Sequence, residues 1–215
     1  MNSGKSDRNR TAGIKPLNAL MKGDFVDAAE PWAIFRAWMA EAEAAEPNDP
    51  SAMSLATVDQ DGLPDVRMVL LKGADERGLL FFTSYEGRKG RELAENPRAA
   101  MLVHTAGRQI RVEGTVEPLE PAESDDYWDV RPRASQISAW VSSQSEPIES
   151  REELDRRYAE FDAAHPEELA RPPHWGGFRL FPESYEFWEH RDNRLHDRIR
   201  YRREGDSWVV ERLQP

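Results

Sequence analysis

The sequence predicts a mainly β protein of the α+β class, folded as a closed or half-closed antiparallel barrel with flanking helices. About seven β-rich runs recur along the chain, each bounded by turn-forming residues. Only a few helical segments lie between these runs. The chain has 215 residues, 39% of them hydrophobic, which is enough for one core of ordinary size. We therefore expect a single domain over residues 25–215.

The N-terminal region divides into a tail and a helix. Residues 1–24 show no apolar periodicity, so we expect a flexible tail or an arm that orders on a partner. A run from Pro31 to about Pro47 then places its apolar residues at helical spacing: Ile34, Phe35, Trp38 and Met39. Because proline suits a first helical turn, one amphipathic helix is expected to begin at Pro31.

Three β-rich runs follow this helix, at 52–58, 65–73 and 78–84. The turn-forming residues between them are Asp61-Gly62 and Glu76-Arg77-Gly78. Short runs separated by such turns predict an antiparallel meander.

The rest of the chain alternates between helical and extended character. RKGRELAE, residues 88–95, predicts a short helix that ends at Asn96-Pro97, because the residue before a proline disfavours the helical conformation. The runs at 99–105 and 108–119 predict a second hairpin. Helical composition returns at 121–142 and 150–163, and strand character resumes at 178–190, 194–203 and 207–213.

Composition excludes several classes of protein. A net charge of -11 repels nucleic acid and anionic lipid, so neither is an expected partner. No apolar run is long enough to span a membrane, and the N-terminus lacks the apolar segment of a signal peptide. The sequence contains no cysteine, which excludes disulfides, thiolate metal sites and a cysteine nucleophile. A cytoplasmic setting fits these observations.

NRLHDRIR, residues 193–200, places positive groups against this acidic background. As an extended strand it would put Arg194, His196, Arg198 and Arg200 on one face. Leu195, Asp197 and Ile199 would then occupy the other face. We expect Arg200 to be solvated and Asp197 to pair with an arginine across the sheet.

A first anion site is predicted where a strand meets a helix. Lysine is scarce, and after Lys22 it occurs only at Lys72 and Lys89. In RMVLLK, alternation puts Arg67 on one face and Lys72 on the other. The turn that follows carries Thr83, Ser84, Gly87, Arg88 and Lys89 at a helix N-terminus, where cations oppose the helix dipole and an anionic ligand would compensate. The alternative is that these charges simply face solvent.

A second anion site is suggested by RPRASQ, residues 131–136, and AWVSSQS, residues 139–145. The alternative is helix capping by Ser135 and Ser145. The five histidines show no close metal-ligand spacing beyond His190 and His196, so no metal is expected. The chain contains no GxGxxG, no P-loop and no GxSxG elbow, so its chemistry is expected to come from a bound cofactor.

The ordered motifs RMVLLK, FFTSYEGRKG, NPRAAMLV, RQIRVEG, RPRASQISAWVSSQS, HWGGFRL, YEFW and RLHDR closely resemble the pyridoxamine 5'-phosphate oxidase family. The resemblance covers about residues 31–215. It implies an FMN-binding split barrel that works as a homodimer with the flavin across the subunit interface. It also implies oxidation of pyridoxamine or pyridoxine 5'-phosphate to pyridoxal 5'-phosphate, with O2 as acceptor and hydrogen peroxide as product, in vitamin B6 biosynthesis.

The resemblance assigns residues by matching motifs. FMN contacts would fall on Arg67, Met68, Val69, Leu70, Leu71, Lys72, Phe82, Thr83, Arg88, Lys89, Gln109, Gln144, Ser145, Trp188 and Arg198. The substrate would be held by Lys72, Tyr127, Arg131, Ser135, Arg194 and His196. Of these, Arg194 and His196 are the expected catalytic pair, as orienting and electrostatic groups able to assist proton movement.

Three departures from the family pattern concern the substrate pocket. The turn EHRDN, residues 189–193, replaces a segment that usually begins Gln-Gly, and the hairpin VHTAGRQ is about two residues shorter than usual. The family's N-terminal arginine-tyrosine arm is not recognisable. Two other functions stay open: a related split-barrel flavin oxidase of the phenazine type, and a non-catalytic carrier of FMN or pyridoxal phosphate.

Overall fold

The computed structural model describes residues 30–45, 49–105 and 107–215. The predicted N-terminal tail, and Ala106 of the shortened hairpin, lie outside these residues. The secondary-structure elements are α2 (Pro31–Ala45), β1 (Ala52–Val58), β2 (Pro64–Leu70), β3 (Gly73–Asp75), β4 (Gly78–Ser84), α3 (Arg88–Glu95), β5 (Arg98–Thr105), β6 (Arg108–Pro118), α4 (Pro121–Asp129), α5 (Arg133–Val141), α6 (Arg151–Ala164), β7 (Trp175–Glu189), the 3-10 turn η2 (Asp192–Arg194), β8 (Asp197–Glu204) and β9 (Ser207–Arg212).

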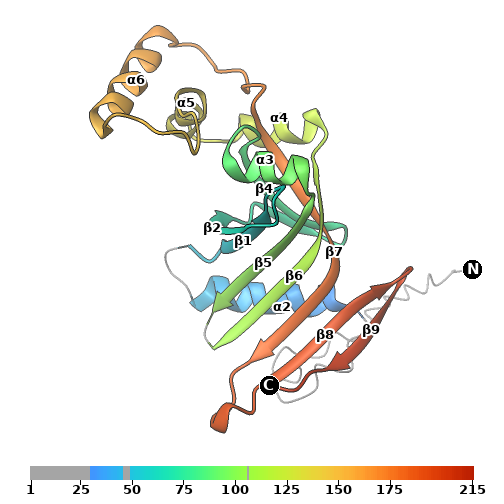
Figure 1. Ribbon diagram of the computed structural model, residues 1–215. Coiled ribbons are helices and arrows are strands. Elements are labelled where there is room, and N and C mark those ends of the chain that lie inside the picture. The colour runs from blue at the N-terminus through green and yellow to red at the C-terminus, as the bar shows by residue number, and fades with distance from the viewer. Residues whose placement is uncertain (1–29, 46–48, 106) are drawn as a thin grey trace, which may run out of the picture.

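The strands form one antiparallel sheet that curls into a half-barrel with helices around it, which confirms the predicted fold class (Figure 1). The strand order is β2-β1-β5-β6-β7-β4-β3, and β8 and β9 extend the sheet from β7. β7 pairs with β6 along its length, with β4 over its first part and with β8 over its last part. One long strand therefore connects the two ends of the molecule.

The structure differs from the predicted elements in two places. The predicted strand 65–73 divides into β2 and β3, because the amide of Leu71 bonds to Ser51 while the amide of Lys72 bonds to Leu80. The chain thus changes partners between consecutive residues, and the described residues contain nine strands rather than about seven. The predicted helical region 121–142 divides into α4 and α5 around Arg131-Pro132.

Within β2, alternation follows the prediction. Arg67 and Val69 are half-buried, whereas Met68 and Leu70 are exposed. The inner face of β2 thus carries both a charged and an apolar side chain, whereas its outer face is apolar at Met68 and Leu70.

The main core lies between α2 and the concave face of the sheet. Phe35 and Trp38 of α2 are almost fully buried and pack edge-on against Tyr185 and Phe187 of β7. Burial of such side chains contributes about 2–3 kcal/mol each. A second, smaller cluster, centred on Trp128, joins α4 and α5 to the start of β7. No helix among the described residues is long and apolar enough to span a membrane.

Candidate functional site

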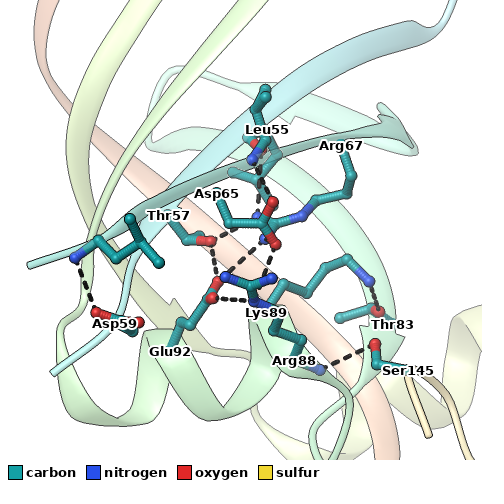
Figure 2. A network of polar contacts seen from close by, with 12 residues as sticks. Leu55, Thr57, Asp59, Asp65, Arg67, Thr83, Arg88, Lys89, Glu92 and Ser145 are labelled. Carbon is teal, nitrogen blue, oxygen red and sulfur yellow. Dashed lines mark hydrogen bonds and ion pairs between the residues drawn. The ribbon is translucent and has the colours of Figure 1, made fainter. Parts of the chain in front are cut away.

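β2 directs Arg67 toward the inside of the sheet, where it meets residues of β1 and α3. Its guanidinium donates hydrogen bonds to the Leu55 carbonyl at 3.2 Å, to Asp65 at 2.6 Å, to Glu92 at 3.0 Å and to the Thr57 hydroxyl (Figure 2). A planar guanidinium with this many acceptors is held in one orientation.

α3 adds a second arginine to the same carboxylates. Arg88 Nε lies 2.8 Å from Glu92 and 3.1 Å from Asp65 (Figure 2). Burial alone would raise the pKa of Glu92, but hydrogen bonds from Thr57, Arg88 and Arg67 outweigh it and lower that pKa. Glu92 is therefore a charged, buried anchor for both arginines.

Lys89 is the third cation and is itself buried. Its Nζ donates to the Gln144 side-chain oxygen at 2.8 Å and to the Thr83 hydroxyl at 3.3 Å. Burial, followed by the charge of Arg67, lowers the pKa of Lys89. Lys89 makes no ion pair within the described part of the chain.

We call Arg67, Arg88 and Lys89 the cationic cluster. Its three positive charges face only two carboxylates, so a positive excess stays at the start of α3. Gly87 allows Gln144 to approach the start of α3 closely, because a Cβ there would come within 2.5 Å of the Gln144 side-chain oxygen. The helix dipole at the start of α3, buried Lys89 and half-buried Arg67 favour a phosphate there, as predicted for the first anion site. Exposed Arg88 and Lys72 agree instead with the solvent-facing alternative.

A second positive site lies among aromatic rings. Tyr127 stacks on Phe82 with ring centroids 3.9 Å apart, and the Arg131 guanidinium lies 4.3 Å from the Trp175 ring centroid. Arg131 donates to the Ser135 carbonyl at 2.9 Å, but its buried Nε has no partner among the described residues. Burial lowers the pKa of Arg131. A buried donor without an acceptor is suited to an anionic ligand.

The capping alternative is wrong for Ser135. That residue lies inside α5, whose N-cap is Pro132 without a side-chain hydrogen bond, and α6 is capped by Ser150. Ser145 instead accepts a hydrogen bond from the Arg88 amide at 3.1 Å (Figure 2). Its hydroxyl therefore supports the start of α3 from a distant segment.

Lys72 stands apart from these contacts. Its side chain is exposed and makes no hydrogen bond or ion pair within the described residues. The structure therefore brings Tyr127, Arg131 and Ser135 together but leaves Lys72 unconnected to them by any polar contact.

The remaining predicted FMN residues gather at the other end of β7. Gln109 on β6, Trp188 on β7 and Arg198 on β8 are register neighbours across three strands. Buried Glu186 holds Arg198 Nε at 2.7 Å, and the His196 ring lies 4.5 Å from the Trp188 ring, centroid to centroid. We call Gln109, Trp188, His196 and Arg198 the rim.

The predicted strand face of NRLHDRIR is only partly correct. β8 begins at Asp197, so Arg194 and His196 lie in the turn before it, because Asn193 and Arg194 have positive φ and end the extended run. Asp197 pairs with an arginine across the sheet as predicted, namely Arg212, at 2.6 Å.

The prediction for Arg200 is wrong. Rather than being free in solvent, Arg200 pairs with Glu211 of β9 at 2.7 Å. The acidic partner comes from a strand that lies opposite β8, which the sequence of NRLHDRIR alone does not show.

One copy of the chain does not bring the cationic cluster and the rim together. Phe82 pairs with Gly177 near the start of β7, whereas Trp188 lies near its end. About eleven strand residues separate these two positions, which corresponds to roughly 35 Å along the strand. Figure 1 shows α3 at one end of β7 and β8 at the other.

Sequence reasoning missed the acidic residues that hold the cations. Glu92 follows Arg88 by one helical turn, a spacing that could have revealed the pair. Glu186 and Arg198 meet only through strand register, and no local signal shows that contact. Within the described ranges no group of three or more His, Asp or Glu side chains could hold a metal ion.

Comparison with protein families gives two matches that together cover most of the chain. Residues 39–165 match the family described as pyridoxamine 5'-phosphate oxidase. Residues 175–215 match the pyridoxine 5'-phosphate oxidase C-terminal dimerisation region.

Curated relatives and solved structures agree with these matches. The pyridoxine/pyridoxamine 5'-phosphate oxidases of Rhodopseudomonas palustris (strain TIE-1) and Azorhizobium caulinodans are each 50% identical, covering 94% and 95% of this chain and 98% and 99% of their own. PhzG from Burkholderia lata, solved with tetrahydrophenazine-1-carboxylic acid, is 37% identical with a TM-score of 0.84, over 90% of this chain and 96% of that one. A pyridoxamine 5'-phosphate oxidase-related, FMN-binding protein from Nostoc punctiforme shares the fold, with a TM-score of 0.70 and 19% identity over 86% of this chain and 97% of its own.

Proposed function

Because the chain belongs to the pyridoxamine 5'-phosphate oxidase family, we propose that it oxidises pyridoxamine or pyridoxine 5'-phosphate to pyridoxal 5'-phosphate. The observation that carries this proposal is the 50% identity to curated oxidases over nearly the whole of both chains. The same proposal includes one FMN-binding split-barrel domain over residues 25–215 and a cytoplasmic location, in keeping with the absence of cysteine.

The cationic cluster fits the phosphate of FMN. The excess positive charge at the start of α3 and the uncompensated Lys89 suit a dianion, and Thr83, Gln144 and Ser145 add polar contacts beside it. FMN held there would supply the redox chemistry: it would accept a hydride equivalent from the substrate carbon that bears the amine or alcohol and pass two electrons to O2, giving hydrogen peroxide. The protein residues bind and orient the two ligands.

We propose that the flavin site is completed by a second copy of the chain. The family's C-terminal dimerisation region spans residues 175–215, which include Trp188 and Arg198. Val66, Met68 and Leu70 on the outer face of β2 are 63%, 61% and 37% exposed, an apolar stripe suited to burial against a partner. A second copy can bring its rim to the cationic cluster of the first. Of the predicted FMN contacts in this segment, Val69 of β2 and Leu71 just after it are half-buried and would contact the flavin ring, whereas Met68 and Leu70 lie on the outer face.

We propose that Arg131 holds the substrate phosphate together with Tyr127 and Ser135. The buried Arg131 Nε without a partner supports this role. Lys72 is a further proposed phosphate contact, although it makes no polar contact with these three within one copy. Arg194 and His196 are proposed to hold the pyridine ring, and the His196 ring lies 4.5 Å from the ring of Trp188, a proposed FMN contact.

The phenazine-type oxidase is the second candidate, because PhzG shares the fold at 37% identity. The higher identity to the pyridoxamine phosphate oxidases favours the first. A carrier without activity would share the FMN site but not the turnover.

Activity assays on the purified, FMN-reconstituted protein distinguish these functions. Pyridoxamine 5'-phosphate in air should yield pyridoxal 5'-phosphate, ammonia and hydrogen peroxide. Turnover of a tetrahydrophenazine carboxylic acid instead would move the assignment to the phenazine type. Bound FMN without turnover of either substrate would indicate a carrier.

The substrate role of Arg131 has its own test. Arg131→Ala removes charge-assisted hydrogen bonds and should raise KM for pyridoxamine 5'-phosphate about 10- to 100-fold, with FMN retention unchanged. Steady-state kinetics and FMN titration measure the two effects. An equal loss of FMN would contradict the separation of the two anion sites.

A further inference from the structure

The turn between β7 and β8 carries Arg194 and His196 in an uncommon backbone conformation. Asn193 has φ 57° and Arg194 has φ 60°, a region that non-glycine residues seldom adopt. Two such residues in sequence persist only where surrounding contacts hold them. The contacts around this turn therefore hold Arg194 and His196 in place.

The side chain of Arg191 closes the turn. Its Nε lies 2.7 Å from Asp197 and its Nη2 lies 2.6 Å from Glu189. One guanidinium thus bridges the last residue of β7 and the first residue of β8.

Both carboxylates are anchored elsewhere in the fold. Glu189 lies 2.9 Å from Arg108 of β6, whose guanidinium is 4.6 Å from the Trp38 ring of α2. Asp197 also pairs with Arg212 of β9. The position of Arg191 is therefore tied to α2, β6 and β9.

The backbone of Arg191 has a separate contact with His196. The Arg191 amide lies 3.2 Å from His196 Nδ1. An amide N–H can only donate, so Nδ1 must accept and carry no proton. In a neutral imidazole the proton is then on Nε2, which makes no hydrogen bond to the described residues.

We propose that Arg191 is a positioning residue that fixes His196 as the Nε2–H tautomer, so that His196 offers the substrate a hydrogen-bond donor instead of a proton acceptor. The identity of the ligand, a phosphorylated pyridine with acceptor atoms on its ring, rests on the proposed function. The tautomer rests on the contacts of the turn alone.

Nuclear magnetic resonance of the FMN-reconstituted, full-length protein labelled with 15N-histidine tests the tautomer directly. The His196 signals, assigned by their loss in His196→Gln, should show a proton on Nε2 and none on Nδ1. A proton on Nδ1 would overturn the proposal. This result does not depend on turnover, so it is separate from a failure of the proposed function.

Substitution tests the role of Arg191. Arg191→Ala should let His196 populate both tautomers and should lower kcat/KM for pyridoxamine 5'-phosphate about tenfold, the size of one neutral hydrogen bond, with FMN retention unchanged. Arg202→Ala is the matched control, because Arg202 of β8 is similarly exposed and, among the described residues, forms an ion pair only with Glu204, at 2.8 Å. It should change neither quantity.

Two outcomes decide the matter. Reduced kcat/KM in Arg191→Ala with an unchanged tautomer would contradict the positioning role. Should Arg191→Ala fail to fold, Asp197→Asn removes one of the two carboxylates of the bridge at constant size. Asp197→Asn should also let His196 populate both tautomers and should also lower kcat/KM. An unchanged tautomer in this variant would equally refute the proposal.

Discussion

The cationic cluster and the rim both present positive groups, but the fold supports them differently. In the cluster, buried Glu92 and half-buried Asp65 hold Arg67 and Arg88 on a strand and a helix (Figure 2). At the rim, His196 comes from a turn with positive φ values and depends on Arg191. The difference indicates that the cluster is preorganised by its own carboxylates, whereas the position of His196 depends on a few contacts within the turn.

The largest expected effect is on FMN affinity, after a substitution in the cationic cluster. Arg67→Ala removes a proposed phosphate ligand and leaves Glu92 buried with less compensation, so the Kd for FMN should rise roughly 100- to 1000-fold. Fluorescence titration with FMN measures this change. Arg77→Ala, which removes an exposed arginine paired with Asp75, is the control and should leave the Kd within about twofold.

Mixing two inactive variants tests whether the two regions meet across subunits. Arg67→Ala and Trp188→Ala should each lose activity, yet co-refolded mixtures should recover up to about one quarter of wild-type activity. Half of the dimers would be mixed, and each would contain one site without a substitution. Activity assays before and after mixing decide the point, and no recovery would contradict a site shared between two copies.

A smaller effect is expected on the free energy of unfolding at low pH. Because the folded-state pKa of Glu92 is lowered, its contribution to stability is present above the ordinary pKa of 4.5 and is lost as pH falls below that value. Urea unfolding of the FMN-free protein from neutral pH to about pH 4 should show this loss. Glu92→Gln should be less stable at neutral pH, and its free energy of unfolding should fall less steeply as the pH is lowered. The same pH dependence in both proteins would contradict this role of Glu92.

The sequence predicted local elements better than the contacts between them. The helix at 88–95 and the strand at 78–84 match the structure, because apolar spacing and turn residues are local signals. β8 starts later than predicted because Asn193 and Arg194 leave the extended region, which their residue types do not reveal. The roles of Glu186 and Arg191 depend on strand register and on tertiary ion pairs, so no pattern within the chain could show them.

Alternation along β2 links cofactor loading to assembly. Arg67 faces the proposed flavin phosphate site while Met68, the next residue, faces outward in the apolar stripe. A one-residue insertion in this strand would exchange the two faces and damage both functions at once. If the rim of a partner completes the flavin site, an unpaired subunit would retain flavin poorly. Unpaired subunits would then release little hydrogen peroxide into the cell, without any separate regulatory mechanism.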